Sequence, residues 1–148
     1  MPSFTRNINQ ISRCAHVYRS DSLAGSGLGS SHYFYILIVC AEPGISQDQL
    51  AKRLYINKSS VTRALVTLEE NGFVERHPSE EDKRVIKIFP TQRATKILPE
   101  VRRIARTWNQ FLLAELDEQE KAQFLATLEK ITKRAQSYVD LNLSAEDL

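Results

Sequence analysis

The chain has 148 residues, of which 42% are apolar and 26% are charged, and its 20 Lys and Arg barely exceed its 18 Asp and Glu. This length suits one domain or two small ones, and the composition excludes collagen-like, low-complexity and disordered chains. The longest apolar run, residues 33–41, falls far short of the roughly 18 residues of a membrane span. Since the first ten residues also lack the apolar stretch of a signal peptide, we expect a cytoplasmic protein with no membrane partner.

The first third of the chain predicts two helices separated by a turn. Apolar residues that recur every three or four positions define one helical face from residue 4 to about residue 21: Phe4, Ile8, Ile11, Ala15 and Tyr18. Residues 22–31 hold three of the five glycines and predict a flexible turn. Residues 32–40 are apolar nearly all round, which predicts a buried helix that ends before Pro43-Gly44.

Two short helices with a tight connection follow. Ser46 and Gln49 form a capping-box pattern at the start of the first helix. Asn57 can cap the second helix, which we expect to run to about Asn71, with Gly72 as its C-terminal stop. Two short helices joined by a three-residue turn, the second polar at its N-terminal end, are typical of a helix-turn-helix.

The periodicity then changes to that of strands. Residues 73–77 and 84–89 are rich in Val, Ile and Phe and are separated by a polar turn, which predicts a two-stranded hairpin. Pro90 stops the second strand, and Thr91 can cap a long helix. A hairpin placed directly after a helix-turn-helix is the wing of a winged helix.

Two longer helices are expected after the hairpin. The first has an apolar face that ends near Ala114 or Glu115, and Pro99 inside it should kink the helix or mark a break. Asp117 and Glu120 cap the last helix, whose apolar face consists of Leu125, Leu128, Ile131, Ala135 and Val139.

The charge is distributed unevenly along the chain. Residues 52–106 carry thirteen basic and seven acidic side chains, whereas residues 107–148 carry four basic and eight acidic ones. A basic segment between a neutral head and an acidic tail favours nucleic-acid binding by the middle of the chain. Random scatter of surface charge is the alternative interpretation.

The order of these elements resembles the MarR family of transcriptional regulators. Four stretches carry the resemblance: GISQDQLAKRL (44–54), NKSSVTRALVTLEENGFVER (57–76), Asp82-Lys83-Arg84, and Thr91 at the start of the long helix. One departure follows the wing, where the family often has Leu-Thr-x-x-Gly and this chain has PTQRA (90–94). The departure therefore falls at the start of the long helix.

The resemblance implies a mainly α fold with a small β-hairpin, in which a winged helix-turn-helix is flanked by N- and C-terminal dimerisation helices. We expect a single MarR-like domain over residues 1–148. Within it, residues 32–90 would form the DNA-binding region, and residues 1–21 and 91–148 the dimerisation helices.

The second helix of the helix-turn-helix carries candidate DNA contacts. An α-helix fits the major groove, where base edges present a unique donor and acceptor pattern. The small hydroxyl residues Ser59, Ser60 and Thr62 allow close approach, and Arg63 could reach a guanine edge or a phosphate. Local capping is the alternative for the hydroxyls. Val66 on the same face could contact a thymine methyl group or be a stray surface residue.

Arg84 is the strongest single candidate. The resemblance implies that Arg84 enters the minor groove, held by Asp82, while Lys83 adds a phosphate contact. A narrow minor groove concentrates negative potential and attracts arginine; the alternative is an exposed ion pair of little value. The complete set of expected DNA-binding residues is Lys58, Ser59, Ser60, Thr62, Arg63, Asp82, Lys83 and Arg84.

The first helix and the last two expose more apolar surface than one winged helix can cover. The family solution is a homodimer, which would place two recognition helices on the half-sites of a pseudo-palindromic double-stranded DNA operator. Some of these side chains could instead pack within one subunit. The candidate dimer-interface residues are Phe4, Ile8, Ile11, Leu125 and Leu128.

Many MarR-like proteins release DNA when a small, often aromatic and anionic, effector binds. The candidate pocket residues are Arg13, His16, His32 and Tyr33, each of which could equally be a surface or core-edge residue. Cys14 lies on the first helix, where peroxide-sensing members place a reactive cysteine, so a thiol-based redox sensor is one alternative. Cys40 is expected in the core, and the three histidines show no metal-ligand spacing.

The function expected from these features is that of a dimeric transcriptional regulator, a repressor released by a small ligand. A winged helix used only for protein interaction is a second class, and it would lack the basic, hydroxyl-rich surface seen here. An enzyme is not expected, since no glycine-rich phosphate loop, metal cluster or nucleophile motif appears, and no cofactor is implied.

Overall fold

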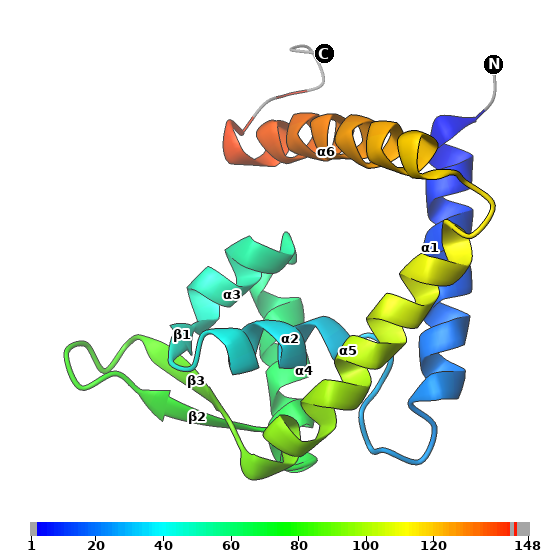
Figure 1. The fold of residues 1–148 in the computed structure, drawn as a ribbon. Helices are drawn as coiled ribbons and strands as arrows, with labels where there is room; N and C mark the ends of the chain where they lie inside the picture. The colour runs from blue at the N-terminus through cyan, green and yellow to red at the C-terminus, as the bar shows by residue number, and fades with distance from the viewer. Residues whose placement is uncertain (1–2, 143, 145–148) are drawn as a thin grey trace. The chain divides into compact units, whose positions relative to one another are not determined.

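A computed structural model describes residues 3–142 and residue 144. Within them it contains six helices and three strands (Figure 1). In chain order these are α1 (Phe4–Ser22), α2 (Tyr33–Ala41), β1 (Ile45–Ser46), α3 (Gln47–Leu54), α4 (Lys58–Glu70), β2 (Val74–Pro78), β3 (Ile86–Pro90), α5 (Gln92–Leu112) and α6 (Glu118–Asp140). None of these helices is both long and apolar enough to cross a bilayer. The chain divides into two compact units, the first ending at Trp108 and the second beginning at Asn109.

The core of the first unit is enclosed by α2, α3, α4, the sheet and α5. Helix α4 contributes Val61, Leu65 and Leu68, whose spacing of three and four residues places them on one buried side. Three further side chains are completely buried: Phe73 at the start of the wing, Ile88 on the central strand β3 and Ile104 on α5. Because burial of each such side chain contributes about 1.5–3 kcal/mol, this shared core fixes α4 against the wing.

The wing is a three-stranded antiparallel sheet in the order β1-β3-β2. Val74 pairs with Pro90 and Pro78 with Ile86, which makes β2 and β3 the expected hairpin. The sequence did not predict the third strand, β1, which pairs Ile45 with Ile88. Two residues are too few to show a strand periodicity, and the second of them, Ser46, is also the N-cap of α3.

The capping residues expected at the starts of α3, α5 and α6 are confirmed. Ser46 with Gln49 and Asp117 with Glu120 form complete capping boxes at α3 and α6. Thr91, at the departure from the family pattern, accepts a hydrogen bond from the Ala94 N–H at 3.3 Å and donates one to the Gly72 carbonyl at 2.6 Å. The α2 helix begins one residue later than expected, so that His32 is its N-cap residue.

Helix α5 runs without a break from Gln92 to Leu112. The possible break at Pro99 is therefore absent from this helix, because a single proline removes only one intrahelical hydrogen bond. The expected face reached Ala114 or Glu115, but the helix ends before both. A turn follows, in which the Leu116 N–H donates to the Leu113 carbonyl at 3.2 Å.

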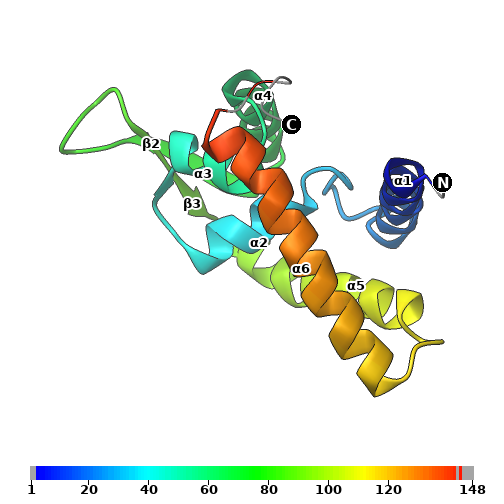
Figure 2. The same ribbon diagram turned by 90° about the horizontal axis from the view of Figure 1, so that it is seen from above.

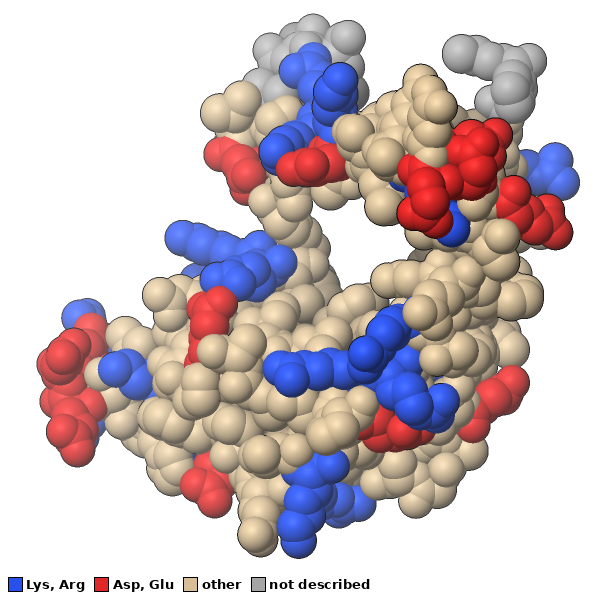
Figure 3. All heavy atoms as spheres, viewed as in Figure 1, with Lys and Arg blue, Asp and Glu red and all other residues tan. Residues whose placement is uncertain are grey.

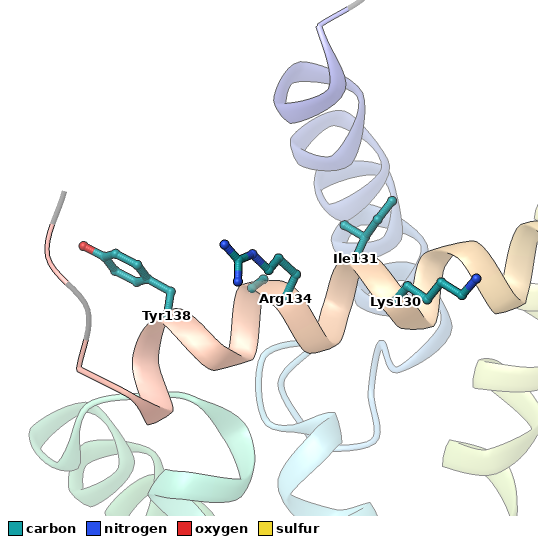
Figure 4. A pocket seen from close by; sticks show the side chains of 5 residues that line it. Lys130, Ile131, Arg134 and Tyr138 are labelled. Atoms are coloured by element: carbon teal, nitrogen blue, oxygen red, sulfur yellow. The ribbon is translucent and has the colours of Figure 1, made fainter. Parts of the chain in front are cut away.

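In the second unit, α6 has no fully buried side chain. Leu125 is 49% exposed and Val139 is 58% exposed, although both belong to the expected apolar face. Figure 4 shows Ile131, Arg134 and Tyr138 projecting from this helix. Together with Lys130 and Ala135 they line an open hollow of about 600 Å³.

Candidate nucleic-acid interface

The turn between α3 and α4 sets the direction of the recognition helix. Tyr55 ends α3 in the left-handed conformation, with φ of 53° and ψ of 40°, and the Ile56 N–H donates to the Ala51 carbonyl at 3.1 Å. Asn57 then caps α4, because its Oδ1 accepts from the Ser60 N–H and from the Ser59 hydroxyl, both at 2.8 Å. The expected helix-turn-helix is therefore present, and its second helix is capped at its N-terminal end.

Each hydroxyl at the start of α4 has a local partner. Besides the bond from Ser59 to Asn57, the Thr62 hydroxyl donates to the Lys58 carbonyl at 2.9 Å and accepts from Gln47 Nε2 at 2.6 Å. The Ser60 hydroxyl accepts from Arg63 Nη2 at 3.0 Å. Local hydrogen bonding, the alternative to a DNA contact, thus occurs at all three positions, and a hydroxyl with one such bond retains further hydrogen-bonding capacity.

The two cations at the start of α4 remain accessible. The Lys58 ammonium lies 3.1 Å from Asp48 Oδ1 in the first turn of α3, and both side chains are more than half exposed. Such a pair is worth little in water, so a phosphate can replace Asp48 at small cost. Arg63 is also exposed.

The hairpin carries Arg84 at its end. Arg84 makes two parallel hydrogen bonds to Asp82, from Nε to Oδ1 and from Nη2 to Oδ2, each 3.0 Å long. The Arg84 backbone N–H also donates to Asp82 Oδ1 at 3.0 Å. This fork lowers the pKa of Asp82 and raises that of Arg84. The two hydrogen bonds to Asp82 fix the orientation of the Arg84 side chain. Its outer face stays open, because the side chain is 90% exposed.

The hairpin projects away from the helices of the first unit in both views (Figures 1 and 2). Its loop is closed by a hydrogen bond from the Ser79 N–H to the Val85 carbonyl at 2.7 Å. Acidic and basic side chains gather together at this edge (Figure 3), since Glu80 and Glu81 precede Lys83. The tip is therefore not uniformly basic, and Lys83 and Arg84 follow acidic residues in the chain rather than forming part of a broad positive patch.

An ion pair that the sequence did not predict ties the wing to α4. Arg76 on β2 donates from Nε at 2.9 Å and from Nη2 at 2.6 Å to Glu69 Oε2, near the end of α4. Its backbone N–H donates to Glu69 Oε1 at 3.1 Å. These hydrogen bonds lower the pKa of Glu69. The pair fixes the first wing strand relative to the recognition helix.

Arg93 was also missed, although its position marked the departure from the family pattern. Its guanidinium donates to the Asn71 carbonyl at 2.6 Å and to the Ser26 carbonyl at 3.0 Å, and lies 4.5 Å from the centre of the Phe73 ring. A Cβ on Gly27 would lie 2.6 Å from this guanidinium. Arg93 thus joins the end of α4 to the loop between α1 and α2.

The four expected pocket residues have different surroundings. His16 Nδ1 lies 3.1 Å from the Ser30 hydroxyl, and Arg13 is exposed on α1. Tyr33 is buried, with the Arg19 guanidinium 5.6 Å from its ring centre, and burial raises the pKa of Tyr33. His32 instead lines a groove beside α4, where burial lowers its pKa.

That groove has a volume of about 330 Å³ and lies between the first turn of α2 and α4. Its polar residues come from both sides, and Tyr35, Ile56 and Ala64 complete the lining. The residues around it are Ser31, His32, Tyr35, Ile56, Ser60, Arg63, Ala64 and Thr67.

The remaining candidates lie on other surfaces. Cys14 is exposed on α1, whereas Cys40 is half-buried and has a raised pKa because of that burial. Leu128 is half-buried, and the other expected dimer residues are exposed: Phe4, Ile8, Ile11 and Leu125. Among the residues that the structure describes, no three His, Cys, Asp or Glu side chains are grouped as metal ligands would be.

Comparisons with known proteins agree with this geometry. The model of the MarR family matches residues 29–86. The chain is 28% identical over 133 residues to the uncharacterized HTH-type transcriptional regulator YybA of Bacillus subtilis strain 168, a match that covers 90% of this chain and 89% of that protein. The solved structure of the transcriptional regulator SlyA is 26% identical, with a TM-score of 0.90 over 95% of this chain and 99% of the other.

A further structure shares the fold. It is a putative MarR family transcriptional regulator from Listeria monocytogenes, complexed with 26mer DNA. Its TM-score is 0.86 at 23% identity, and the match covers 97% of this chain and 98% of that one.

Proposed function

We propose that this chain is a MarR-family transcriptional regulator, a homodimeric repressor that binds a pseudo-palindromic operator and is released by a small ligand. The recognition helix α4 enters the major groove, and the wing places Arg84 in the adjacent minor groove. Its DNA contacts come from the residues expected at the start of α4 and at the end of the wing.

The observation that carries this proposal is the fork between Asp82 and Arg84. An arginine that is 90% exposed is ordinarily mobile, but this one is held by three hydrogen bonds to a single carboxylate. Preorganisation of this kind lowers the entropic cost of placing a guanidinium in a groove. A narrow minor groove then attracts it by its enhanced negative potential.

The dimer is supported by the apolar side chains that the chain leaves exposed. Phe4, Ile8 and Ile11 are 41–54% exposed on one face of α1, and Leu125 is 49% exposed on α6. Soluble monomers rarely expose such contiguous apolar faces, so a second copy of the chain is the natural partner. Two recognition helices related by a two-fold axis then address half-sites about one helical turn apart.

Release by an anionic effector is supported by Arg19 on α1. Its guanidinium lies 5.3 Å from the centre of the Phe34 ring and 5.6 Å from that of Tyr33. Among the described residues its buried Nε has no hydrogen-bond partner. A cation beside aromatic walls, with an unsatisfied donor, suits a small aromatic anion.

Selection of bound sequences from a random duplex pool tests the proposal. We expect the selected sequences to converge on an inverted repeat whose half-sites are about 10 base pairs apart, and light scattering to give the mass of a dimer. A pool that remains random after selection, or a monomeric mass, would contradict it.

A further inference from the structure

The groove between α2 and α4 has the chemistry of an oxyanion site. Arg63 brings a guanidinium with five N–H donors, one of which donates a hydrogen bond to the Ser60 hydroxyl. The Ser60 hydroxyl accepts that bond and can still donate its own proton. Ser31 and His32 add a hydroxyl and an imidazole at the other wall. None of the lining residues is Asp or Glu, so the groove presents donors and one positive charge with no acidic side chain among them.

The position of the groove on α4 indicates which oxyanion it meets. An α-helix with its side chains is about 10–12 Å across, and the major groove is about 12 Å wide, so the two flanks of an inserted helix face the two phosphate backbones. Thr62 faces α3, to which Gln47 connects it. Ser60 is two residues away and therefore roughly opposite Thr62 around the helix, on the flank that faces α2.

We propose that this groove binds a phosphate group of the DNA backbone, with Ser31 and His32 of the α2 end and Ser60 and Arg63 of α4 as its contacts. This inference rests on the proposed function, since it requires α4 to enter the major groove. It assigns α2 a direct contact with DNA. It also gives Arg63 a specific role as a phosphate ligand rather than a reader of bases.

Ser31 provides the sharpest test, because it is exposed at the rim of the groove. Ser31→Glu places a negative charge where the phosphate would lie. We expect it to lower operator affinity by about tenfold or more, and to reduce the slope of log K against log salt concentration by about one unit. Ser20→Glu is the matched control, since Ser20 is an exposed serine on α1 outside the groove and gives the same net charge.

A backbone scan locates the contact on the DNA. Operator duplexes with single methylphosphonate substitutions remove one phosphate charge at a time. We expect one position per half-site at which neutralisation weakens binding by the wild-type protein and restores part of the affinity lost in Ser31→Glu. If Ser31→Glu binds as Ser20→Glu does, or if its loss is the same at every scanned position, the groove is not a backbone contact.

A free phosphate ion is the other source of the same chemistry. The ring signals of His32, assigned by comparison with His32→Gln, should shift on addition of operator DNA and show no saturable shift with inorganic phosphate at constant ionic strength. Saturable binding of inorganic phosphate that competes with the operator would overturn the assignment to DNA. If the wild-type protein binds no duplex, the proposed function fails as well; if Arg84→Ala weakens binding while Ser31→Glu does not, only the present inference fails.

Discussion

Asp82 fixes the direction of the Arg84 guanidinium, which is otherwise open to solvent and therefore to a DNA groove. Arg84→Ala is expected to weaken operator binding by roughly 1–3 kcal/mol and to relax the sequence preference at the positions beside the wing. Fluorescence anisotropy with the selected operator and with variants mutated at those positions measures both effects.

Lys83→Ala provides the contrast for that measurement. If Lys83 contacts a phosphate, its removal should weaken binding to all sequences about equally and reduce the salt slope by about one unit. Equal behaviour of the two variants would contradict a groove-reading role for Arg84, and unchanged affinity in Arg84→Ala would remove that residue from the interface.

Several of the candidate residues that the sequence predicted have partners only two or three positions away in the chain. Asp82 and Arg84 are two residues apart, and Asn57 caps a helix that begins at the next residue. Arg93, in contrast, bonds the Ser26 carbonyl 67 positions away. No periodicity or motif spacing reports such a contact, so only the folded chain shows which cations join elements and which remain open to DNA.

At the scale of elements, the contribution of the Asn57 cap of α4 to the free energy of unfolding can be measured by itself. Asn57→Ala removes an acceptor shared by the Ser60 N–H and the Ser59 hydroxyl, and is expected to lower the free energy of unfolding by about 1 kcal/mol. Urea denaturation measures the change. Asp117→Ala removes the corresponding cap of α6 and should destabilise that helix without altering operator preference. If Asn57→Ala and Asp117→Ala both lose operator preference, the loss is caused by general destabilisation rather than by removal of the cap of α4.

The ion pair between Glu69 and Arg76 is expected to position the wing. Glu69→Gln should lower the free energy of unfolding by roughly 0.5–1 kcal/mol, the upper range for an accessible pair. It should also reduce the further cost of Arg84→Ala in a double-mutant cycle of operator binding, because the wing then loses its fixed position. Glu100→Gln is the matched control, since the bonds from Arg103 to Glu100 stay within α5. Full additivity of Glu69→Gln with Arg84→Ala would show that the pair does not position the wing.

The same pair gives a pH dependence of stability. The pKa of Glu69 lies below its ordinary value of 4.5 in the folded protein, chiefly because of the hydrogen bonds from Arg76. A depressed carboxyl pKa contributes stability above the unfolded value that is lost as the pH falls through the folded one. The difference in unfolding free energy between wild type and Glu69→Gln should therefore be largest near neutral pH and shrink below pH 4.5. A difference that grows on acidification would contradict this assignment.

The elements themselves were largely predictable, because their signals are local. Capping residues and apolar spacing marked α3, α4 and α6, and β-branched runs marked β2 and β3. The strand β1 was not predictable, since it consists of two residues stabilised by pairing with β3. The course of α5 through Pro99 was likewise decided by packing of the buried residues Val101 and Ile104, which outweighs one missing hydrogen bond.

At the scale of the whole molecule, the net charge of +2 conceals a separation of basic from acidic side chains along the chain. The basic excess lies in residues 52–106 of the first unit, and the acidic excess lies mainly in the second. On α6, acidic side chains gather near its start and basic ones farther along (Figure 3). Attraction to DNA is therefore a property of one unit, and we expect it to be modest overall and strongly salt-dependent.

Dimerisation is a prediction for the complete assembly. Leu125→Glu places a charge in the exposed apolar face of α6 and is expected to give a monomer with greatly reduced operator affinity. Thr127→Glu, two residues away and thus roughly on the opposite side of the helix, should remain dimeric. Light scattering separates the two outcomes, and a dimeric Leu125→Glu would exclude this face from the interface.

The most direct test of the central claim is the affinity of the dimer for duplex DNA over a series of salt concentrations. Anisotropy titrations would use the selected operator and a random duplex of equal length. A regulator that neutralises several phosphates and reads two grooves should bind the operator more tightly than the random duplex, with a steep linear fall of log K with log salt concentration for both. Absence of binding even at low salt, or equal affinity for both duplexes throughout, would contradict sequence-specific DNA binding by this protein.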